Sequence, residues 1–465
     1  MAKELHVVIL PWSAFGHIIP LIQLSIALAK AQIHVSFIST PKNIQRLPKI
    51  PPELQSLITI VPFPLPTLDA ADRLLPEGAE ATVDIPFEKM DDLKFAFDLL
   101  RQPFKQFIAD QVPDWIITDF AAHWAVDVAR EYGVPVAYFS PFSAATHVFC
   151  GSLEYRSHVP PSPEVFTSPP EWVPFPSLLA LKEFEAVHFL AGFFNVNRSG
   201  ISDAERVAKI VLASQVLAFR SCNEIEGEYL DLYAKLTGKP VIPTGLLPPK
   251  ESKRESGNDV IFEWLDKQKP RSVVFVGFGS ECKVSKEQVY EIAHSELPFL
   301  WALRKPSWAS TDAEALPLGF VDRTSKKGLV CMGWVPQIEI LGHPSVGGSL
   351  FHSGWGSVIE TLQFGHCFVV LPLIVDQPLN ARLLVEKGLA AEVKRNNDGS
   401  FTADDIAKTL RLAMVEEEGE HLRINARKAA AVFGDEKLHQ DHYLGAFVDY
   451  LKNNGRKGLL DKNDR

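Results

Sequence analysis

The stretch HVVILPWSAFGHIIPLIQLSIALAKAQIHVSFIST, from His6 to Thr40, carries the pattern that decides the fold. Its two apolar runs, His6 to Leu10 and His34 to Thr40, are typical of short buried strands. The segment between them, Ile18 to Ala31, is expected to be a helix. A helix that joins two buried strands indicates a parallel sheet, because parallel strands need a crossover connection.

This alternation continues through the first half of the chain and starts again after residue 258. Pro248 and Pro249 stop regular structure, and the polar run that follows them is typical of a linker. A chain of 465 residues also exceeds the size, about 250–300 residues, at which one core stops growing. We therefore predict an α/β fold of two Rossmann-like doubly wound domains facing a cleft. The expected parts are an N-terminal domain (1–247), a linker (248–258), a C-terminal domain (259–441), and a helix and tail (442–465) packing back on the N-terminal domain.

Composition excludes several classes of function. The net charge of −10, with no dense block of Lys and Arg, argues against a general nucleic-acid surface. The five cysteines are odd in number and scattered, so neither a disulfide framework nor a zinc site is indicated. The apolar run from Val7 to Leu10 is too short for a signal sequence or a membrane span. We expect a cytoplasmic protein.

The block from Trp334 to Gln377 mixes residue types that a purely structural segment does not need. Within it, VGGSLFHSGWGSVIE passes from a small apolar strand through a glycine-rich turn into an amphipathic helix expected to begin near Ser357. The free N–H groups of a helix N-terminus can bind a diphosphate without a metal. Side chains of the block suit the other parts of a nucleotide sugar: His352, Ser353 and Ser357 for phosphate, Glu360 for ribose, Trp334 for a base, and Asp376 and Gln377 for sugar hydroxyls.

The block resembles the signature box of plant family-1 UDP-glycosyltransferases, written W-x-P-Q, then H-C-G-W-N-S, a Glu three residues on, and a closing D-Q. The matching residues are Trp334, Pro336, Gln337, His352, Gly354, Trp355, Ser357, Glu360, Asp376 and Gln377. The resemblance extends over nearly the full chain and implies a GT-B fold. It assigns UDP-sugar binding to Gly16, Ser280, Trp334, Val335, Gln337, His352, Gly354, Trp355, Gly356, Ser357, Glu360, Asp376 and Gln377.

Three features depart from the family pattern. Ser353 stands where the family has Cys, and Gly356 stands where it has an Asn that is expected to contact phosphate. The expected helix Lys286 to Glu296 is about one turn of 3.6 residues shorter than usual. These departures keep open an alternative, a non-catalytic protein that binds a nucleotide sugar or another small molecule.

The segment PWSAFGH places His17 at the start of a helix, where Gly16 allows close approach to the backbone. Transfer of a sugar to oxygen needs a general base, and a neutral histidine suits that role near pH 7. Asp119, at the end of the apolar strand WIITDF, could orient the imidazole. The resemblance assigns the catalytic roles to His17 and Asp119.

The sequence gives fewer indications of the acceptor than of the donor. Pro11, Trp12 and Phe15 resemble the branch of the family that adds a sugar to a sugar already present on a flavonoid, terpenoid or steroid glycoside. Aromatic residues could line an apolar acceptor site, and the candidates are Trp12, Phe15, Phe142 and Phe193. By family rule Gln377 favours UDP-glucose as donor, with UDP-rhamnose next.

No convincing metal-binding Asp-x-Asp is present in the sequence, so we expect no metal and no cofactor besides the UDP-sugar co-substrate. An NAD-dependent oxidoreductase is a further alternative that rests on fold alone. Gly277 and Gly279 begin a G-x-G-x-x-G pattern, but Cys282 occupies the third glycine position. We expect a monomer that binds a donor and a small glycoside, with no nucleic-acid partner.

Overall fold

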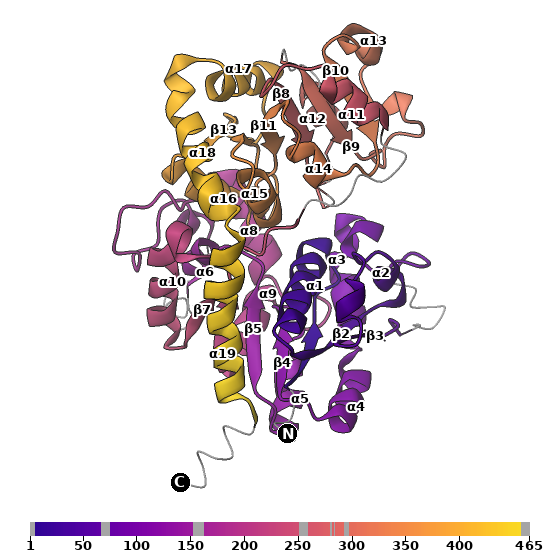
Figure 1. Cartoon of the computed structure of the whole chain (residues 1–465), viewed down its shortest axis with the longest axis vertical. Coiled ribbons are helices and arrows are strands. Elements are labelled where there is room, and N and C mark those ends of the chain that lie inside the picture. Colours follow the sequence, from indigo (N-terminus) through magenta and orange to yellow (C-terminus); the bar gives the residue numbers. More distant parts are fainter. Residues whose placement is uncertain are drawn as a thin grey trace. The chain divides into compact units, whose positions relative to one another are not determined.

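The structure is a computed structural model that describes residues 5–66, 75–151, 162–250, 259–279, 281–282, 284–292 and 297–456. It divides into two compact units (Figure 1). Unit 1 consists of Met1–Ser162, Phe189–Leu247 and Glu436–Arg465, and unit 2 consists of Pro163–His188 and Pro248–Asp435. Each unit is built on one parallel sheet, as the strand–helix alternation predicts.

The sheet of unit 1 has seven strands in the order β3-β2-β1-β4-β5-β6-β7, all parallel. The strands are β1 His6–Leu10, β2 His34–Ser39, β3 Ile58–Pro62, β4 Trp115–Thr118, β5 Val136–Ser140, β6 Val216–Phe219 and β7 Val241–Pro243. The order reverses between β1 and β4, which makes this pair the topological switch point. Ligands of doubly wound sheets bind outside the carboxyl ends of strands at such a point.

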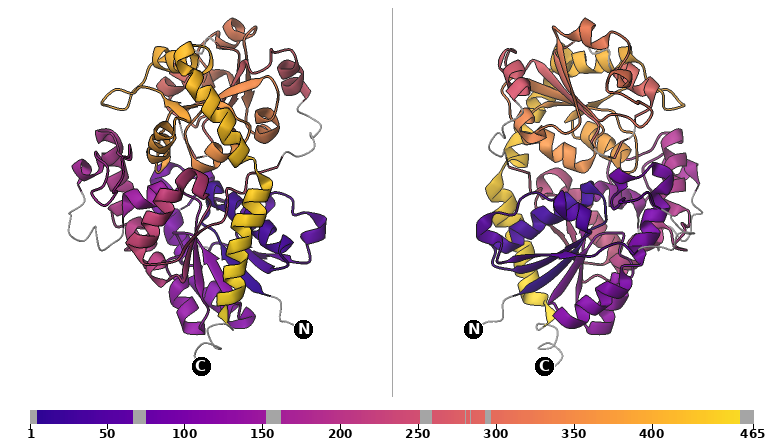
Figure 2. Two further views of the ribbon diagram at one scale, coloured as in Figure 1. Left: turned by 60° about the vertical axis from the view of Figure 1, so that its left-hand side comes forward. Right: turned by 90° about the vertical axis from the view of Figure 1, so that its right-hand side faces the viewer.

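Helices cover both faces of this sheet, as the two views of Figure 2 show. They are α1 Phe15–Lys30, α2 Pro41–Gln45, α3 Met90–Asp98, α4 Arg101–Gln111, α5 Ala125–Tyr132, α6 Ala144–Cys150, α9 Asp203–Ala213, α10 Asn223–Thr237 and α19 Gly445–Asn454. Helix α8, Glu183–Phe194, begins in unit 2 and ends in unit 1. A π-helical segment, Leu438–Leu444, leads directly into α19.

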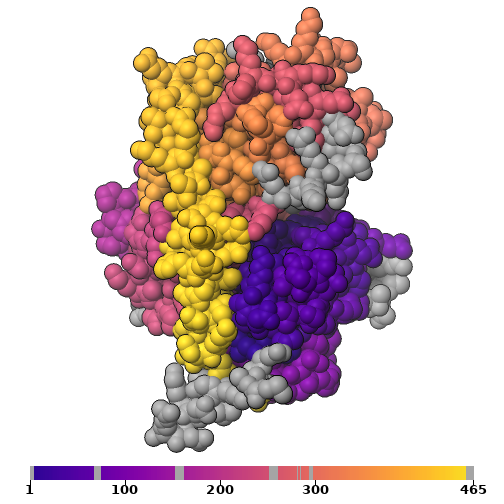
Figure 3. All heavy atoms as spheres, in the orientation of Figure 1, coloured from indigo at the N-terminus to yellow at the C-terminus, as the bar shows by residue number. Residues whose placement is uncertain are grey.

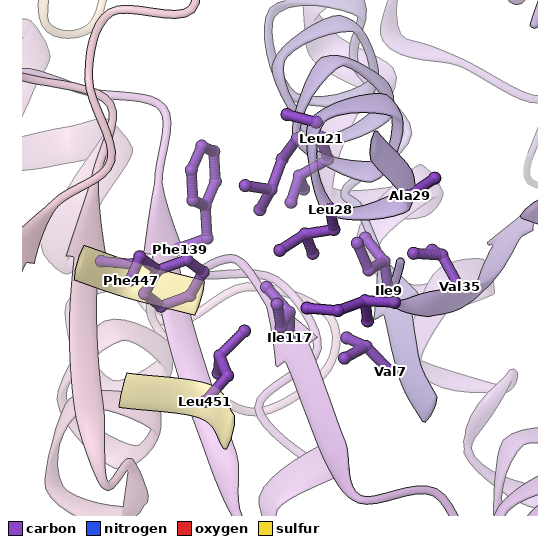
Figure 4. Packing of buried hydrophobic residues seen from close by; sticks show 14 of the residues in the cluster. Val7, Ile9, Leu21, Leu28, Ala29, Val35, Ile117, Phe139, Phe447 and Leu451 are labelled. Carbon is purple, nitrogen blue, oxygen red and sulfur yellow. The ribbon is translucent and has the colours of Figure 1, made fainter. Parts of the chain in front are cut away.

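The core of unit 1 joins residues from opposite ends of the chain. Val7 and Ile9 of β1 point to the same face because side chains alternate along a strand. On that face they belong to one buried cluster with Leu21 of α1 and with Phe447 and Leu451 of α19 (Figure 4). In Figure 3 the yellow C-terminal helix lies against the indigo N-terminal part of the chain. Burial on both faces explains why the strands are continuous apolar runs.

The sheet of unit 2 has six parallel strands in the order β10-β9-β8-β11-β12-β13. The strands are β8 Val273–Gly277, β9 Phe299–Leu303, β10 Gly328–Met332, β11 Val346–Phe351, β12 Cys367–Val370 and β13 Ala390–Glu392. The helices are α11 Asp259–Asp266, α12 Lys286–Ile292, α13 Phe320–Thr324, α14 Gln337–Leu341, α15 Trp355–Leu362, α16 Gln377–Glu386, α17 Ala403–Met414 and α18 Glu420–Phe433. Here the switch point lies between β8 and β11.

Several boundaries differ from those expected from the sequence. Pro163–His188 belongs to unit 2 although it precedes Pro248, the division near which we expected the first domain to end. The C-terminal segment of unit 1 begins at Glu436 rather than at residue 442, because the π-helical segment already packs there. The end of the shortened helix, residues 293–296, and most of the expected linker, 251–258, lie outside the described residues. None of the helices in the described part of the chain has the length and apolar character needed to cross a membrane.

Candidate active site

In unit 1, His17 and Asp119 meet at the switch point. Leu10 pairs with Thr118 at the ends of β1 and β4, so the segments that follow these strands leave the sheet side by side. His17 lies in the first turn of α1, and its Nδ1 is 2.9 Å from Oδ2 of Asp119. His17 is 7% exposed and Asp119 is fully buried, so water competes little for this hydrogen bond.

The Asp119 carboxylate is held by the backbone around it. Oδ2 also accepts a hydrogen bond from the N–H of Trp12 at 2.7 Å, and Oδ1 accepts one from the N–H of Ala121 at 3.1 Å. A carboxylate accepts but does not donate, so the proton in the contact with His17 is on Nδ1. The neutral imidazole then carries its lone pair on Nε2, the atom that a general base uses.

Aromatic rings surround the imidazole. The ring centroids of Phe120 and Phe142 lie 5.4 Å and 5.1 Å from that of His17. Trp12 is only 3% exposed and packs edge-on against Phe97 at 5.2 Å, so it belongs to the core behind the site. An apolar wall of this kind suits an apolar acceptor.

The other two predicted acceptor residues are placed differently. Phe15 is 8% exposed and buried in the first turn of α1. Phe193 lies on α8, where it stacks on Phe189 with centroids 5.4 Å apart. Phe120 was missed by sequence reasoning, although its position directly after Asp119 was an available signal. Gly16 is exposed, and a Cβ built there meets no atom within 4 Å, so the backbone is open to an approaching ligand.

In unit 2, helix α15 begins at Trp355, two residues earlier than the sequence suggested. Gly354 is its N-cap residue, and the carbonyl of Gly354 accepts the first helical hydrogen bond, from the N–H of Val358 at 3.0 Å. The N–H groups of Gly356 and Ser357 precede the first N–H that bonds within the helix, so they can face an anion. The side chain of Trp355 is 3% exposed and Gly356 has none, so neither residue offers a side chain to a ligand.

His352 lies between the two glycine turns of the unit. Gly277 of β8 pairs with Phe351 of β11, so the turn after β8 lies beside His352. A Cβ built at Gly279 would lie 2.7 Å from Cε1 of His352, and one at Gly354 would lie 2.8 Å from its Nε2. Burial lowers the pKa of His352 to about 4, so the ring is neutral near pH 7. Its buried Nδ1 has no partner among the described residues and could serve a ligand.

Ser353, one of the departures from the family pattern, joins α16 to the turn between β11 and α15, the predicted phosphate turn. The residue has a positive φ of 61° and is fully buried. Its Oγ donates to the carbonyl of Gln377 at 2.8 Å, and its own carbonyl accepts a hydrogen bond from Nδ2 of Asn380 at 3.0 Å. A cysteine would offer a weaker donor at the same place. Asn380 is a contributor that sequence reasoning missed.

Neighbouring side chains hold the residues predicted to contact the base and the ribose. Trp334 is 77% exposed, and the guanidinium carbon of Arg304 lies 5.3 Å from its ring centroid. The side-chain amide of Gln337 donates to the carboxylate of Glu360. Gln337 therefore orients Glu360, and Arg304, which sequence reasoning did not identify, orients Trp334. Val335, between Trp334 and Gln337 in the sequence, is half-buried.

The two predicted sugar contacts differ in exposure. Asp376 is partly exposed, and its Oδ2 accepts a hydrogen bond from Nδ2 of Asn380. Gln377 is 4% exposed, and its Oε1 accepts from the N–H groups of both Leu373 and Ile374 at 2.9 Å. Its Nε2 donates to Sγ of Cys282 at 3.3 Å. Both lone pairs of the amide oxygen are thus used, so Gln377 can reach a sugar only as an N–H donor.

Ser280, the remaining predicted phosphate contact, lies outside the described residues. In the described part of the chain no group of three or more His, Cys, Asp or Glu side chains is arranged to hold a metal ion. All five cysteines carry free thiols.

Comparison with known proteins decides the family. A family model described as UDP-glucoronosyl and UDP-glucosyl transferase matches residues 253–428. The UDP-glycosyltransferase 91A1 of Arabidopsis thaliana is 42% identical over 466 residues, which is 97% of each chain. The chain belongs to the plant UDP-glycosyltransferases. Another such UDP-glycosyltransferase, the soyasaponin III rhamnosyltransferase of Glycine max, is 39% identical over 97% of this chain and 96% of its own.

Solved structures show the fold of this UDP-glycosyltransferase. That of Glycyrrhiza uralensis UGT73P12, complexed with glycyrrhetinic acid 3-O-monoglucuronide, matches with a TM-score of 0.79 at 23% identity. The match covers 99% of this chain and 98% of that one. The fold is therefore GT-B, as the resemblance implied, and the protein is an enzyme of the UDP-glycosyltransferase class.

The glycine pair around His352 makes a first prediction for this UDP-glycosyltransferase. Gly279 has a φ of +66°, so Gly279→Ala adds both backbone strain and a clash with the imidazole. We expect the Kd for UDP, measured by calorimetry, to rise by about tenfold or more as His352 moves away from the helix N-terminus. Gly238→Ala is the matched control, because Gly238 has a φ of +62° and open space around its Cβ position. Equal UDP affinity in the parent and Gly279→Ala would contradict the phosphate site.

Proposed function

We propose that this enzyme transfers glucose from UDP-glucose, or as the next choice rhamnose from UDP-rhamnose, to a sugar hydroxyl of a plant secondary-metabolite glycoside. The observation that carries the chemistry is the contact between His17 and Asp119 at 2.9 Å. It provides an oriented imidazole beside an apolar wall, and the start of α15 in the second unit is the predicted anion site.

The proposed reaction is a single displacement. Nε2 of His17 takes the proton from the acceptor hydroxyl as the oxygen attacks the anomeric carbon of the donor. The new C–O bond forms while the bond between the anomeric carbon and the diphosphate oxygen breaks. UDP leaves with the electron pair, and the configuration at the anomeric carbon inverts. Asp119 stabilises the imidazolium that forms, because its carboxylate already accepts from Nδ1.

Departure of UDP needs stabilisation of the negative charge that develops on the diphosphate. We assign this role to the N–H groups at the start of α15 and to the neutral imidazole of His352. Ser357, the third residue of α15, offers its hydroxyl at the same place. On this proposal the leaving group needs no metal ion and no further cofactor.

Two observations support a glycoside acceptor, the aromatic rings beside His17 and the name of a relative. The rings of Phe120 and Phe142 beside His17 suit an apolar aglycone, whose contact with them would bring a nearby hydroxyl to the base. The relative from Glycine max is named for rhamnosyl transfer to soyasaponin III, and saponins are glycosides. Ser353 and Gly356 leave the backbone of the phosphate turn in place, which favours an enzyme over a non-catalytic binding protein.

An acceptor screen tests the proposal. Matched pairs of flavonoid, terpenoid and steroid aglycones and their monoglucosides are incubated with UDP-glucose or UDP-rhamnose, and products are detected by mass spectrometry. We expect the glycosides to gain one sugar and the aglycones to react at least about tenfold more slowly. Faster reaction of the aglycones would overturn the acceptor assignment. Binding of UDP without turnover of any pair would favour the non-catalytic alternative.

We also propose a cytoplasmic monomer. The free thiols of the five cysteines suit a reducing compartment, where disulfides are rare. Light scattering after gel filtration tests the oligomeric state, and a mass near 51.7 kDa is the expected result. A stable dimer at the concentration used for the kinetic assays would overturn it.

A further inference from the structure

The segment Pro163–His188 belongs to unit 2 although the rest of its sequence neighbourhood builds unit 1. Several of its apolar side chains are buried, and those of Phe166, Leu179 and Ala186 are fully so. The ring of Phe184 packs so closely on Gly399 that a Cβ built at Gly399 would lie 2.9 Å from it. This segment, which we call the strap, is therefore a built part of the unit that carries the donor-site residues.

The strap brings a buried charge network with it. The carboxylate of Glu185, about 4% exposed, accepts hydrogen bonds from Arg382 at 2.9 Å and from Arg395. Arg382 also pairs with Glu392, whose other oxygen accepts from Nζ of Lys182 at 2.9 Å. The guanidinium of Arg395 lies over the ring of Phe184, 4.6 Å from its centroid. All of these partners lie within unit 2.

A network of this kind is weak evidence for stability. Taking charges out of water costs several kcal/mol per ion, and well-packed apolar residues are often as stable in the same place. What a network of directional bonds does provide is a defined position for the elements that it joins. The bonds of this network therefore fix the strap against the element that it contacts.

The element that the strap contacts is α16. The backbone N–H of Leu178 donates to Glu386 at 2.7 Å, and Glu185 binds Arg382, so the strap contacts α16 at two residues one turn apart. Arg382 lies five residues after Gln377, about 7.5 Å further along the helix axis. The start of the same helix carries the two predicted sugar contacts and is bonded to the phosphate turn through Ser353.

We propose that the strap positions α16 for the donor sugar, with Glu185 and Arg382 as positioning residues for sugar recognition. The proposal rests on the proposed function, because it assumes that Asp376 and Gln377 contact the sugar of the donor. Neither Glu185 nor Arg382 touches the substrate in this account. They set the position and tilt of the helix whose first turn does so, while the uridine and diphosphate contacts lie on α15, on Trp334 and on its neighbours.

If α16 contacts only the donor sugar, a change in its position should weaken the binding of UDP-glucose more than the binding of UDP. UDP has the nucleoside and the diphosphate but lacks the transferred sugar, so it makes none of the contacts assigned to Asp376 and Gln377 and depends on α16 only through the bonds to Ser353. Arg382→Met is expected to raise the Kd for UDP-glucose by about tenfold while leaving the Kd for UDP within about twofold, both measured by calorimetry without acceptor. Arg382→Lys keeps one of the two ion pairs and is expected to recover about half of the loss on a logarithmic scale.

The matched control is Arg423→Met. Arg423 is a part-buried arginine of the same unit that pairs with Glu420 of α18 at 2.7 Å and donates to the backbone carbonyls of Ala413 and Glu416. The Arg423→Met variant is expected to have a lower melting temperature, with no difference between its effects on the Kd for UDP and the Kd for UDP-glucose. If Arg382→Met is not recovered folded, Glu386→Ala takes its place. It removes the acceptor for the N–H of Leu178 and is expected to raise the Kd for UDP-glucose by about threefold.

Four results would contradict one of the two proposals. Equal weakening of UDP and UDP-glucose binding by Arg382→Met would overturn the role of the strap, and so would a separation of the two affinities by Arg423→Met. Unchanged affinities with a lower melting temperature would also overturn it, by showing a purely structural network. A parent protein that binds neither UDP, UDP-glucose nor UDP-rhamnose would mean instead that the proposed function has failed.

Discussion

Replacing His17 with alanine is expected to lower kcat by about 10²- to 10⁴-fold, the usual contribution of a general base. The variant loses the Nε2 lone pair that accepts the proton of the acceptor hydroxyl. The predicted UDP contacts apart from Gly16 lie in unit 2, so the Kd for UDP should stay within about twofold of the parent value. Product formation by chromatography and UDP binding by calorimetry give the two quantities.

His6→Ala is the matched control for this experiment. His6 begins β1, the same strand whose far end leads to His17, and its Nε2 lies 2.9 Å from Oγ of Ser36. The same substitution there should leave kcat within about threefold of the parent value. If His17→Ala keeps the parent rate, the base is another group and the proposed mechanism is wrong.

The second large effect is expected for Asp119→Asn. The two carboxylate oxygens accept from three donors, the N–H groups of Trp12 and Ala121 and Nδ1 of His17. Asparagine has one acceptor oxygen, and its amide group would face an N–H donor on the other side. The imidazole then loses its preferred tautomer, and we expect kcat to fall by about 10³-fold or more. A buried donor without a partner should also lower the free energy of unfolding by about 1–3 kcal/mol.

Asp114→Asn is the matched control. It shows how far the loss of any carboxylate next to β1 lowers kcat and the free energy of unfolding. Asp114 is 8% exposed and accepts from the N–H of His6 through Oδ2 at 2.9 Å, a bond that the oxygen of asparagine can keep. It should change kcat by less than about threefold. Denaturant unfolding of both variants measures the stability change. A parent-like kcat in Asp119→Asn would remove Asp119 from the mechanism.

Much of the fold could be predicted because its signals are local. Strands buried on both faces of a parallel sheet are continuous apolar runs, and the helix after each strand follows directly in the chain. The same locality explains the site predictions. His17 and Asp119 each follow a strand, and the reversal of strand order between β1 and β4 brings the ends of those two strands together. The start of α15 was misjudged by two residues because helix ends are weakly marked in sequence.

Contacts between distant residues could not be predicted, because no periodicity in the chain records them. Gln377 looks like a free polar side chain in the sequence, yet its amide oxygen is used by its own loop and one N–H of its amide group by Cys282, 95 residues away. Glu185 and Arg395 are 210 residues apart and meet only when the strap packs on unit 2.

The sequence by itself determined the α/β class, the division near Pro248 and the residue types available for binding a nucleotide sugar. Each of these depends on the order of neighbouring residues, which hydrophobic burial and backbone geometry convert directly into strands, helices and turns. The tertiary structure alone decided which side chains remain available to a ligand and which are used internally. That outcome depends on packing between segments far apart in the chain, where each buried polar group must find its partner.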